Sequence, residues 1–227
     1  MFCYKPPKKR GNKGGIELLA AAVVLISAMV TPSALGGSSA GLTGSIAHNH
    51  KLSIFDQKLS FTLPEDWKLA FSEKQNTMFS AEFTPVSDEL RDWSSLFCVQ
   101  GFKGLADSFS PETFLDSIAA IYQESCTGEI TYQKLGESDI DGYSGFTAII
   151  GCSHMPNTHK ATQFNAKSYS SDPKGEIGHY TAISGEQDMY LLHQSMRGEV
   201  FNAEAPPLEP ANYREFMATI APYGLSR

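Results

Sequence analysis

The chain has 227 residues, of which 41% are hydrophobic and 11% aromatic. This is enough apolar mass for one packed domain or two very small ones, and it excludes a collagen, a coiled coil and a wholly disordered chain. From Leu18 onward the chain carries 13 basic and 24 acidic residues, a net charge of −11. A body this acidic repels phosphate backbones, so no nucleic-acid partner is expected.

The first 40 residues have the layout of a secretory signal peptide. A basic stretch over residues 1–13 precedes an apolar run from Leu18 to Val30, and small residues follow from Thr31 to Ala40. At about 1.5 Å per residue the apolar run is shorter than the roughly 30 Å hydrocarbon core of a bilayer. A stable transmembrane span is therefore disfavoured, and we expect no span after processing.

This layout divides the chain into three parts. Residues 1–40 are the signal peptide and its cleavage region, with cleavage expected near Gly36 or Ala40. The polar, unpatterned residues 41–51 predict a flexible lead-in, and residues 52–227 predict a single domain. The product is then periplasmic in a Gram-negative bacterium, or secreted. Retention of the apolar run as an anchor stays an open alternative.

The first part of the domain is predicted to be β-structure. Residues 52–63 offer two short strands about a polar turn, and Pro64–Trp67 break the second strand. Residues 77–84 alternate in polarity as a half-buried strand does, and Pro85 ends that strand. Residues 93–102 are a further strand candidate.

A helix is predicted to begin after Ser110. Ser110 supplies an N-cap hydroxyl, Pro111 suits the first helical position, and Glu112 places an acid in the first turn. The apolar residues that recur at helical spacing are Phe114, Leu115, Ile118, Ile121 and Tyr122. One apolar stripe implies that one face of this helix lies on a sheet.

Two hairpins and a second helix are predicted to follow. Residues 128–136 and 145–152 read as strands joined through Asp141-Gly142, since Asp-Gly favours the positive φ of a tight turn. Residues 176–184 and 189–197 form the second hairpin. Near the end of the chain, apolar residues stand at i, i+3, i+4 and i+7, which predicts a closing amphipathic helix: Tyr213, Phe216, Met217 and Ile220.

The order of strands, helix, four strands and helix predicts an α+β fold. Hairpin-length links make the sheet mostly antiparallel, and the two amphipathic helices must each bury a stripe on it. Between the two hairpins runs a polar loop, residues 153–175, which is long enough to be functional or mobile.

These elements resemble those of the PsbP-like fold superfamily, which includes bacterial periplasmic proteins of the DcrB type. The resemblance covers residues 52–225, and its most specific part is the opening hairpin with Leu63-Pro64-Glu65-Asp66-Trp67. The strand ending at Pro85, the two later hairpins and both helices agree in order. The resemblance implies an accessory or binding protein with a partner surface. The loop over 153–175 and the cysteine pair depart from it.

Three cysteines follow the signal peptide, and an oxidising compartment permits one pair. Cys126 ends the predicted helix and Cys152 ends a predicted strand, so we pair Cys126 with Cys152. Cys98 lies in a short apolar run and is expected to be a buried free thiol. The alternative, a nucleophilic Cys152 beside His154, lacks the third group that would orient the base.

We expect no catalytic, cofactor or metal site. The pairs His48 with His50 and His154 with His159 lack further ligands. The chain has neither a phosphate-binding glycine loop nor a dinucleotide fingerprint. No Gly-x-Ser-x-Gly nucleophile elbow is present, because the sequences around Ser144 and Ser153 each lack a required glycine.

Three aromatic residues beside turns are candidates for a partner surface: Trp67, Trp93 and Tyr143. The structural alternative is that Trp67 and Trp93 close the two ends of the core. The sequence thus favours an exported, non-catalytic accessory or binding protein with a protein partner in the cell envelope. Two alternatives remain: a periplasmic hydrolase using the 153–175 loop, through Ser153, His154 or carboxylates of that loop, and an immunity protein that neutralises a basic toxin.

Overall fold

The computed structural model describes residues 47–159, 169–170 and 172–227. The strands are β1 (Ala47–Ile54), β2 (Gln57–Pro64), β3 (Trp67–Lys74), β4 (Met78–Pro85), β5 (Ser95–Phe102), β6 (Ile130–Ile140), β7 (Tyr143–Met155), β8 (Thr158–His159), β9 (Tyr169–Ser170), β10 (Lys174–Ser184), β11 (Met189–Gly198) and β12 (Gly224–Ser226). The helices are α1 (Pro111–Ser125) and α2 (Tyr213–Met217). The predicted signal peptide lies outside the described residues.

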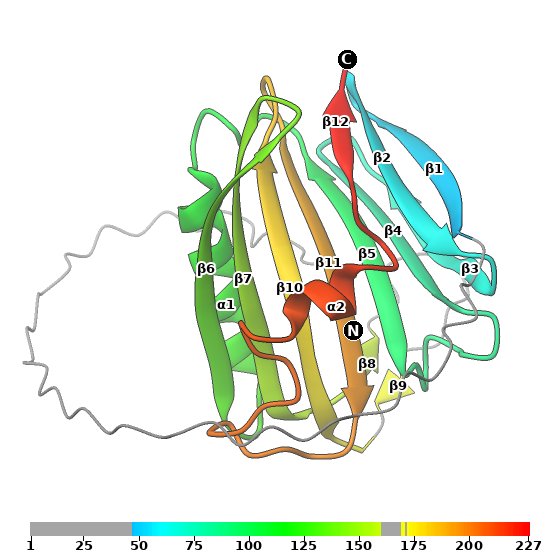
Figure 1. Cartoon of the computed structure of the whole chain (residues 1–227), viewed down its shortest axis with the longest axis vertical. Coiled ribbons are helices and arrows are strands. Elements are labelled where there is room, and N and C mark those ends of the chain that lie inside the picture. Colours follow the sequence, from blue (N-terminus) through cyan, green and yellow to red (C-terminus); the bar gives the residue numbers. More distant parts are fainter. Residues whose placement is uncertain (1–46, 160–168, 171) are drawn as a thin grey trace, which may run out of the picture. The chain divides into compact units, whose positions relative to one another are not determined.

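Seven strands form one antiparallel sheet in the order β3-β4-β5-β11-β10-β7-β6 (Figure 1). A smaller sheet has the order β1-β2-β12, and β8 pairs with β9. The predicted fold class, a mostly antiparallel α+β sandwich with two helices, is therefore confirmed. Among the described residues, neither helix is long and apolar enough to cross a membrane.

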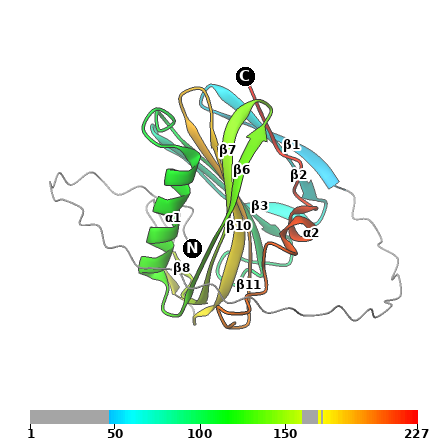
Figure 2. The same ribbon diagram turned by 60° about the vertical axis from the view of Figure 1, so that its left-hand side comes forward.

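The seven-stranded sheet carries structure on both faces (Figure 2). On what we call the α1 face, the apolar stripe of α1 packs over β6, β7 and β10. On the opposite face, the β2 face, lie the small sheet and α2. Because side chains alternate along a strand, each central strand contributes side chains to the hydrophobic clusters on both faces. In β5, Phe97 and Val99 lie on the β2 face, and Leu96 and Cys98 lie on the α1 face.

Local signals explain the two best-predicted features. The Ser110 hydroxyl accepts the Thr113 backbone N–H at 3.1 Å, so α1 begins at the predicted cap. Between β6 and β7, Asp141 has a φ of 54° and Gly142 a φ of 86°. Positive φ at both central positions is what a type I′ hairpin turn requires.

Several stretches differ from the prediction. β3 begins at Trp67, where the sequence predicted a break. The sequence did not reveal this strand, because a bulge between Leu69 and Phe71 disrupts the alternation that identifies strands. Residues 47–51, assigned to the lead-in, form the first part of β1 and pair with β2. β12 has no local signal, since its three residues are a strand only through their pairing with β2.

The closing helix and the long loop are both shorter than predicted. α2 ends at Met217, and Ile220 reaches the core beyond the helix end. β7 extends to Met155 and β10 begins at Lys174, which leaves fewer residues between them. Residues 160–168 and 171 of the predicted loop lie outside the described part of the chain.

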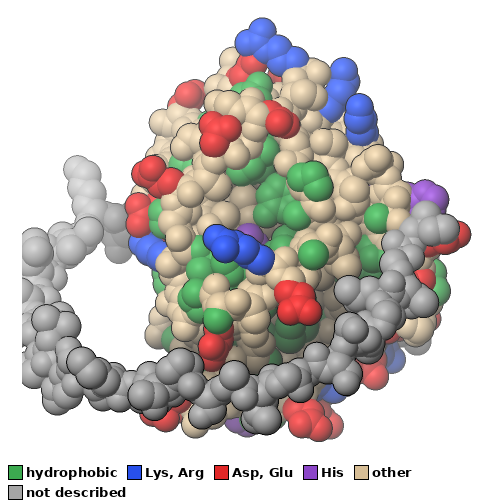
Figure 3. Space-filling model, in the orientation of Figure 1, with side chains coloured by type: hydrophobic (Ala, Val, Ile, Leu, Met, Phe, Trp, Pro, Cys, Tyr) green, Lys and Arg blue, Asp and Glu red, His purple; other side chains and the backbone are tan. Residues whose placement is uncertain are grey.

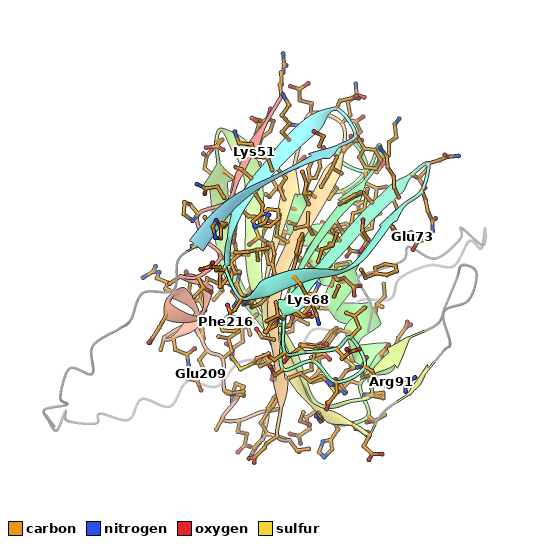
Figure 4. All side chains as sticks on the ribbon, turned by 90° about the vertical axis from the view of Figure 1, so that its right-hand side faces the viewer. Lys51, Lys68, Glu73, Arg91, Glu209 and Phe216 are labelled. Carbon is orange, nitrogen blue, oxygen red and sulfur yellow. A yellow bond between two sulfur atoms is a disulfide. The ribbon has the colours of Figure 1, made fainter. Side chains whose placement is uncertain are left out.

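Both edges of the seven-stranded sheet are irregular. β3 has its bulge at 69–71, and β6 has one between Lys134 and Gly136. Figure 4 looks onto β3 and shows the charged residues Lys68 and Glu73 along it. Bulges and charges on edge strands discourage pairing with another chain, so we do not expect partners to add a strand at either edge.

Gly101 allows the β1–β2 hairpin to pack closely on β5. A Cβ at position 101 would lie 2.5 Å from Ile54 Cγ2. We expect Gly101→Val to lower the free energy of unfolding by about 1–3 kcal/mol through overpacking, as measured by urea denaturation. Gly198→Ala is the matched control, because no atom lies within 4 Å of a Cβ there. Equal stability of the two variants would contradict the expectation.

Candidate functional site

A band of polar side chains crosses β10 and β11 on the α1 face, at the C-terminal end of α1. Residues directly opposite each other in the hairpin supply it: Glu176 faces Arg197, Gly178 faces Ser195 and Tyr180 faces His193. All these side chains share one face because they stand at alternate positions. Tyr122, on the apolar stripe of α1, joins the band through a hydrogen bond from its hydroxyl to Glu176.

A buried ion pair holds the centre of this band. Glu176 Oε2 accepts a hydrogen bond from Arg197 Nη1 at 2.6 Å, and Glu176 Oε1 accepts one from the Tyr122 hydroxyl at 2.6 Å. Arg197 Nη2 donates to the Met155 carbonyl at 2.7 Å, and the guanidinium lies 5.8 Å from the Trp93 ring centroid. The Arg197 side chain is only 1% exposed. Both charges are therefore paired and hydrogen-bonded, as buried charges must be.

An imidazole and a hydroxyl lie beside the ion pair. His193 Nδ1 is 3.1 Å from Ser195 Oγ, and the Tyr180 ring stacks on His193 with centroids 4.6 Å apart. Gly178 leaves the room for this contact, since a Cβ there would lie 2.3 Å from Ser195 Oγ. Glu176 binds Tyr122 and Arg197 rather than His193, so the described residues do not assemble a hydroxyl–imidazole–carboxylate triad here.

Burial moves the pKa values of Tyr122, Tyr180 and His193 away from neutral pH. It raises the pKa of Tyr122 and of Tyr180 well above the usual value of 10, and the Glu176 carboxylate adds to both shifts. Burial also lowers the pKa of His193 from 6.5 to about 3. An acid–base catalyst works best with a pKa near the operating pH. The band is therefore suited to holding α1 on the sheet rather than to transferring protons.

The low pKa of His193 makes stability fall as the pH falls. The unfolded chain binds a proton below about pH 6.5, whereas the folded chain binds it only near about pH 3. In this window stability is lost by at most about 1.4 kcal/mol per pH unit from this group. We expect His193→Phe, which keeps a ring on Tyr180, to flatten the pH dependence between about pH 7 and about pH 5 in urea denaturation. Parallel profiles for variant and wild type would contradict this.

The cavity beside the band is small. It has a volume of about 40 Å³ and is lined by α1, by Met155 and Pro156, and by the band residues Glu176, Tyr180 and His193. That is room for a few water molecules. A drug-sized or metabolite-sized ligand does not fit there without movement of α1.

A larger pocket lies on the β2 face, at the end of β10 and β11 where Gly175 pairs with Gly198. We call it the end pocket. Its volume is about 350 Å³, within the range of ligand pockets. The residues that line it include Ile177, Met196, Glu199, Val200, Phe201 and Ala205. Val200, one of these residues, is 49% exposed and so offers apolar surface at the mouth of the pocket.

The wall of the end pocket is a segment that returns over the sheet. At Gly175 a Cβ would lie 2.1 Å from the Glu199 carbonyl oxygen, so only glycine permits this close approach. Asn202 Oδ1 accepts the Glu204 N–H at 2.9 Å, and Asn212 Oδ1 accepts the Glu209 N–H at 2.8 Å. These two turns fix the segment in place.

The structure does not bring the three predicted surface aromatics together. Trp67 begins β3 and Tyr143 begins β7, near opposite edges of the seven-stranded sheet, and both are half-buried against the β2-face core. The expectation that Trp93 presents surface to a partner is wrong. Trp93 is 1% exposed and packs with Leu96 and Cys98 on the α1 face.

All cysteines of the described part of the chain are disulfide-bonded. Cys126 and Cys152, the pair predicted from the sequence, are joined by a disulfide with Cα atoms 5.7 Å apart. The expectation of a free thiol at Cys98 is wrong, because Cys98 is disulfide-bonded as well. A disulfide-bonded Cys152 is not a nucleophile.

The residues proposed for the alternative hydrolase do not form a reactive centre. Ser153 Oγ is 3.1 Å from His154 Nδ1, but it accepts the Glu129 N–H at 2.9 Å, and Ser153 is 3% exposed. His50 stacks on Phe61. Within the described residues, no three His, Cys, Asp or Glu side chains cluster as metal ligands do.

Sequence reasoning missed both the polar band and the end pocket. A signal for the band was present: His193, Ser195 and Arg197 stand at alternate positions of a predicted strand, so they had to share a face. The end pocket has no comparable signal, because its wall comes from an irregular segment.

No family model and no curated protein matches the chain. Among solved structures, it is similar to the Ran-binding protein Mog1p of Saccharomyces cerevisiae, at 10% identity and a TM-score of 0.40, over 78% of this chain and 86% of Mog1p. It is also similar to LpqN of Mycobacterium tuberculosis, described as involved in cell envelope biogenesis, at 9% identity and a TM-score of 0.35, over 80% of this chain and 92% of LpqN. Likenesses this weak do not tell what this chain binds.

Proposed function

We propose that the chain is exported and acts outside the cytoplasm as a non-catalytic protein that binds a protein partner in the cell envelope. The end pocket carries this proposal, because it is open, mostly apolar and large enough for a partner side chain. The buried polar band supports the non-catalytic part, since burial raises the pKa of Tyr122 and lowers the pKa of His193, away from neutral pH.

Two observations support export. The order of basic, apolar and small residues over 1–40 is that of a signal peptide. The Cys126–Cys152 disulfide suits an oxidising compartment and is unusual in a cytosolic protein of a mesophile. The net charge of −11 after Leu18 supports a protein partner over a nucleic acid.

The export test is a fractionation of a Gram-negative host that expresses the full chain. We expect recovery in the periplasm with a mature N-terminus near residue 37 or 41. Cys126 and Cys152 stay joined after cleavage, so neither should give a titratable thiol under denaturing, non-reducing conditions. A membrane-embedded, full-length product, or titration of both of these thiols, would contradict the proposal.

The binding test is capture of partners from an envelope extract by the immobilised protein. The matched variant is Gly198→Leu, which adds a side chain where no atom lies within 4 Å of a Cβ and fills the end pocket. We expect a reproducible envelope protein on the wild type and not on Gly198→Leu. Absence of any reproducible partner, or equal capture by both, would count against the end pocket as the binding surface.

A further inference from the structure

We infer that the end pocket takes one apolar side chain of a basic protein segment, a large residue flanked by lysine or arginine. This rests on the proposed binding function and names the chemistry of the partner. The occupant follows from the shape of the pocket and from the charge of its rim.

The shape of the pocket suits one inserted side chain. Its floor is apolar, formed by Ile177 and Met196 of the sheet, and Phe201 closes one side. Phe201 also packs against the buried cluster around Leu208, so this wall is part of the core and not a mobile flap. A volume of about 350 Å³ admits a tryptophan or leucine side chain.

The acidic charge beside the pocket comes from its wall: Glu199 lines the pocket, and Glu204 stands next to the lining residue Ala205. The segment over residues 199–212, which forms its wall, contains Glu199, Glu204 and Glu209 and no basic residue. Glu199 and Glu204 are exposed. Figure 4 shows Glu209 close to α2, which carries Phe216, and Figure 3 shows acidic side chains on the lower part of the face that it draws. Arg197 does not neutralise the rim, because its guanidinium is buried on the α1 face with Glu176.

Charge decides between the possible occupants. A second copy of this chain carries the same net charge of −11 after Leu18, so the two rims repel each other. A basic segment is attracted to the rim and gains both rate and specificity from complementary charge. The apolar floor adds the preference for a large side chain at the centre, which basic residues alone do not satisfy.

The test uses tripeptides as probes of the isolated full chain. Methyl NMR signals of Ile177, Met196 and Ala205 report on the pocket directly. We expect acetyl-Lys-Trp-Lys-amide to shift these signals saturably, and acetyl-Glu-Trp-Glu-amide and acetyl-Lys-Ala-Lys-amide to bind about tenfold more weakly or not at all. Equal binding of the Lys and Glu peptides would overturn the charge argument, and equal binding of the Trp and Ala peptides would overturn the anchor.

Variants separate the pocket from general electrostatics. Gly198→Leu should weaken binding of the Lys-Trp-Lys peptide by about tenfold. The double variant Glu199→Gln with Glu204→Gln should weaken it by about threefold, whereas Glu215→Gln on α2, an exposed acid outside the pocket lining, should not. Unchanged binding by both pocket variants would refute the site. If the peptides fail while envelope capture still depends on Gly198, the partner chemistry is wrong and the binding function stands.

Discussion

Replacing Arg197 with methionine is expected to destabilise the fold by about 3–5 kcal/mol, because it leaves the Glu176 carboxylate buried without its cation. Methionine keeps most of the side-chain volume, although it lacks the guanidinium that lies over the Trp93 ring. It removes both the ion pair at 2.6 Å and the hydrogen bond to the Met155 carbonyl. The measurement is the free energy of unfolding in urea at about pH 7.

A second change identifies the cause of this loss. Arg197→Met combined with Glu176→Leu removes both charges, and we expect the double variant to recover part of the lost stability. Tyr122→Phe, which removes only the hydroxyl that donates to Glu176, should cost about 1 kcal/mol. If Arg197→Met costs no more than Tyr122→Phe, the ion pair is not the centre of the band.

The elements that the sequence predicts correctly are determined by interactions between residues close together in the chain. The N-cap at Ser110 and the turn at Asp141-Gly142 depend on groups within three residues of each other, so one stretch of sequence contains the whole cause. The fold class follows from the same elements, since their order and link lengths leave few antiparallel arrangements.

Long-range contacts produced the elements that the sequence did not reveal. β12 is a strand because Leu225 meets Leu59 across the chain, and no property of three residues announces such a pairing. β3 changes sheet immediately after β2 and contains a bulge, so its apolar residues do not alternate. The Trp93 ring likewise lies against the guanidinium of Arg197, which is distant in sequence.

The candidate sites show the same division. The Cys126–Cys152 pair follows from two predicted element ends, whereas the disulfide at Cys98 does not follow from any local pattern. The sequence could have predicted part of the polar band, because alternate polar residues in a buried strand need hydrogen-bond partners. The end pocket could not be predicted from the sequence, since it forms where an irregular segment passes over Gly175.

Removal of the Cys126–Cys152 disulfide is expected to cost about 3–4 kcal/mol, by Cys126→Ala with Cys152→Ala. The bond closes a loop with a sequence separation of 26, and for loops of this length the chain-entropy model gives that magnitude. Chemical reduction is not an equivalent experiment, because Cys98 is disulfide-bonded too. The variant and the wild type should therefore be compared in urea without reductant.

The same disulfide should also be coupled to the polar band. It attaches the end of α1 to β7, one turn beyond Tyr122, whose hydroxyl binds Glu176. Without the disulfide the last turn of α1 frays more readily, so Tyr122→Phe should cost less in the double-alanine background than in the wild type. A double-mutant cycle in urea measures this difference, which we expect to be about 0.5–1 kcal/mol. Strict additivity would show that the end of α1 is held by its apolar stripe alone, with Phe114, Leu115 and Ile118 sufficient to keep Tyr122 in place.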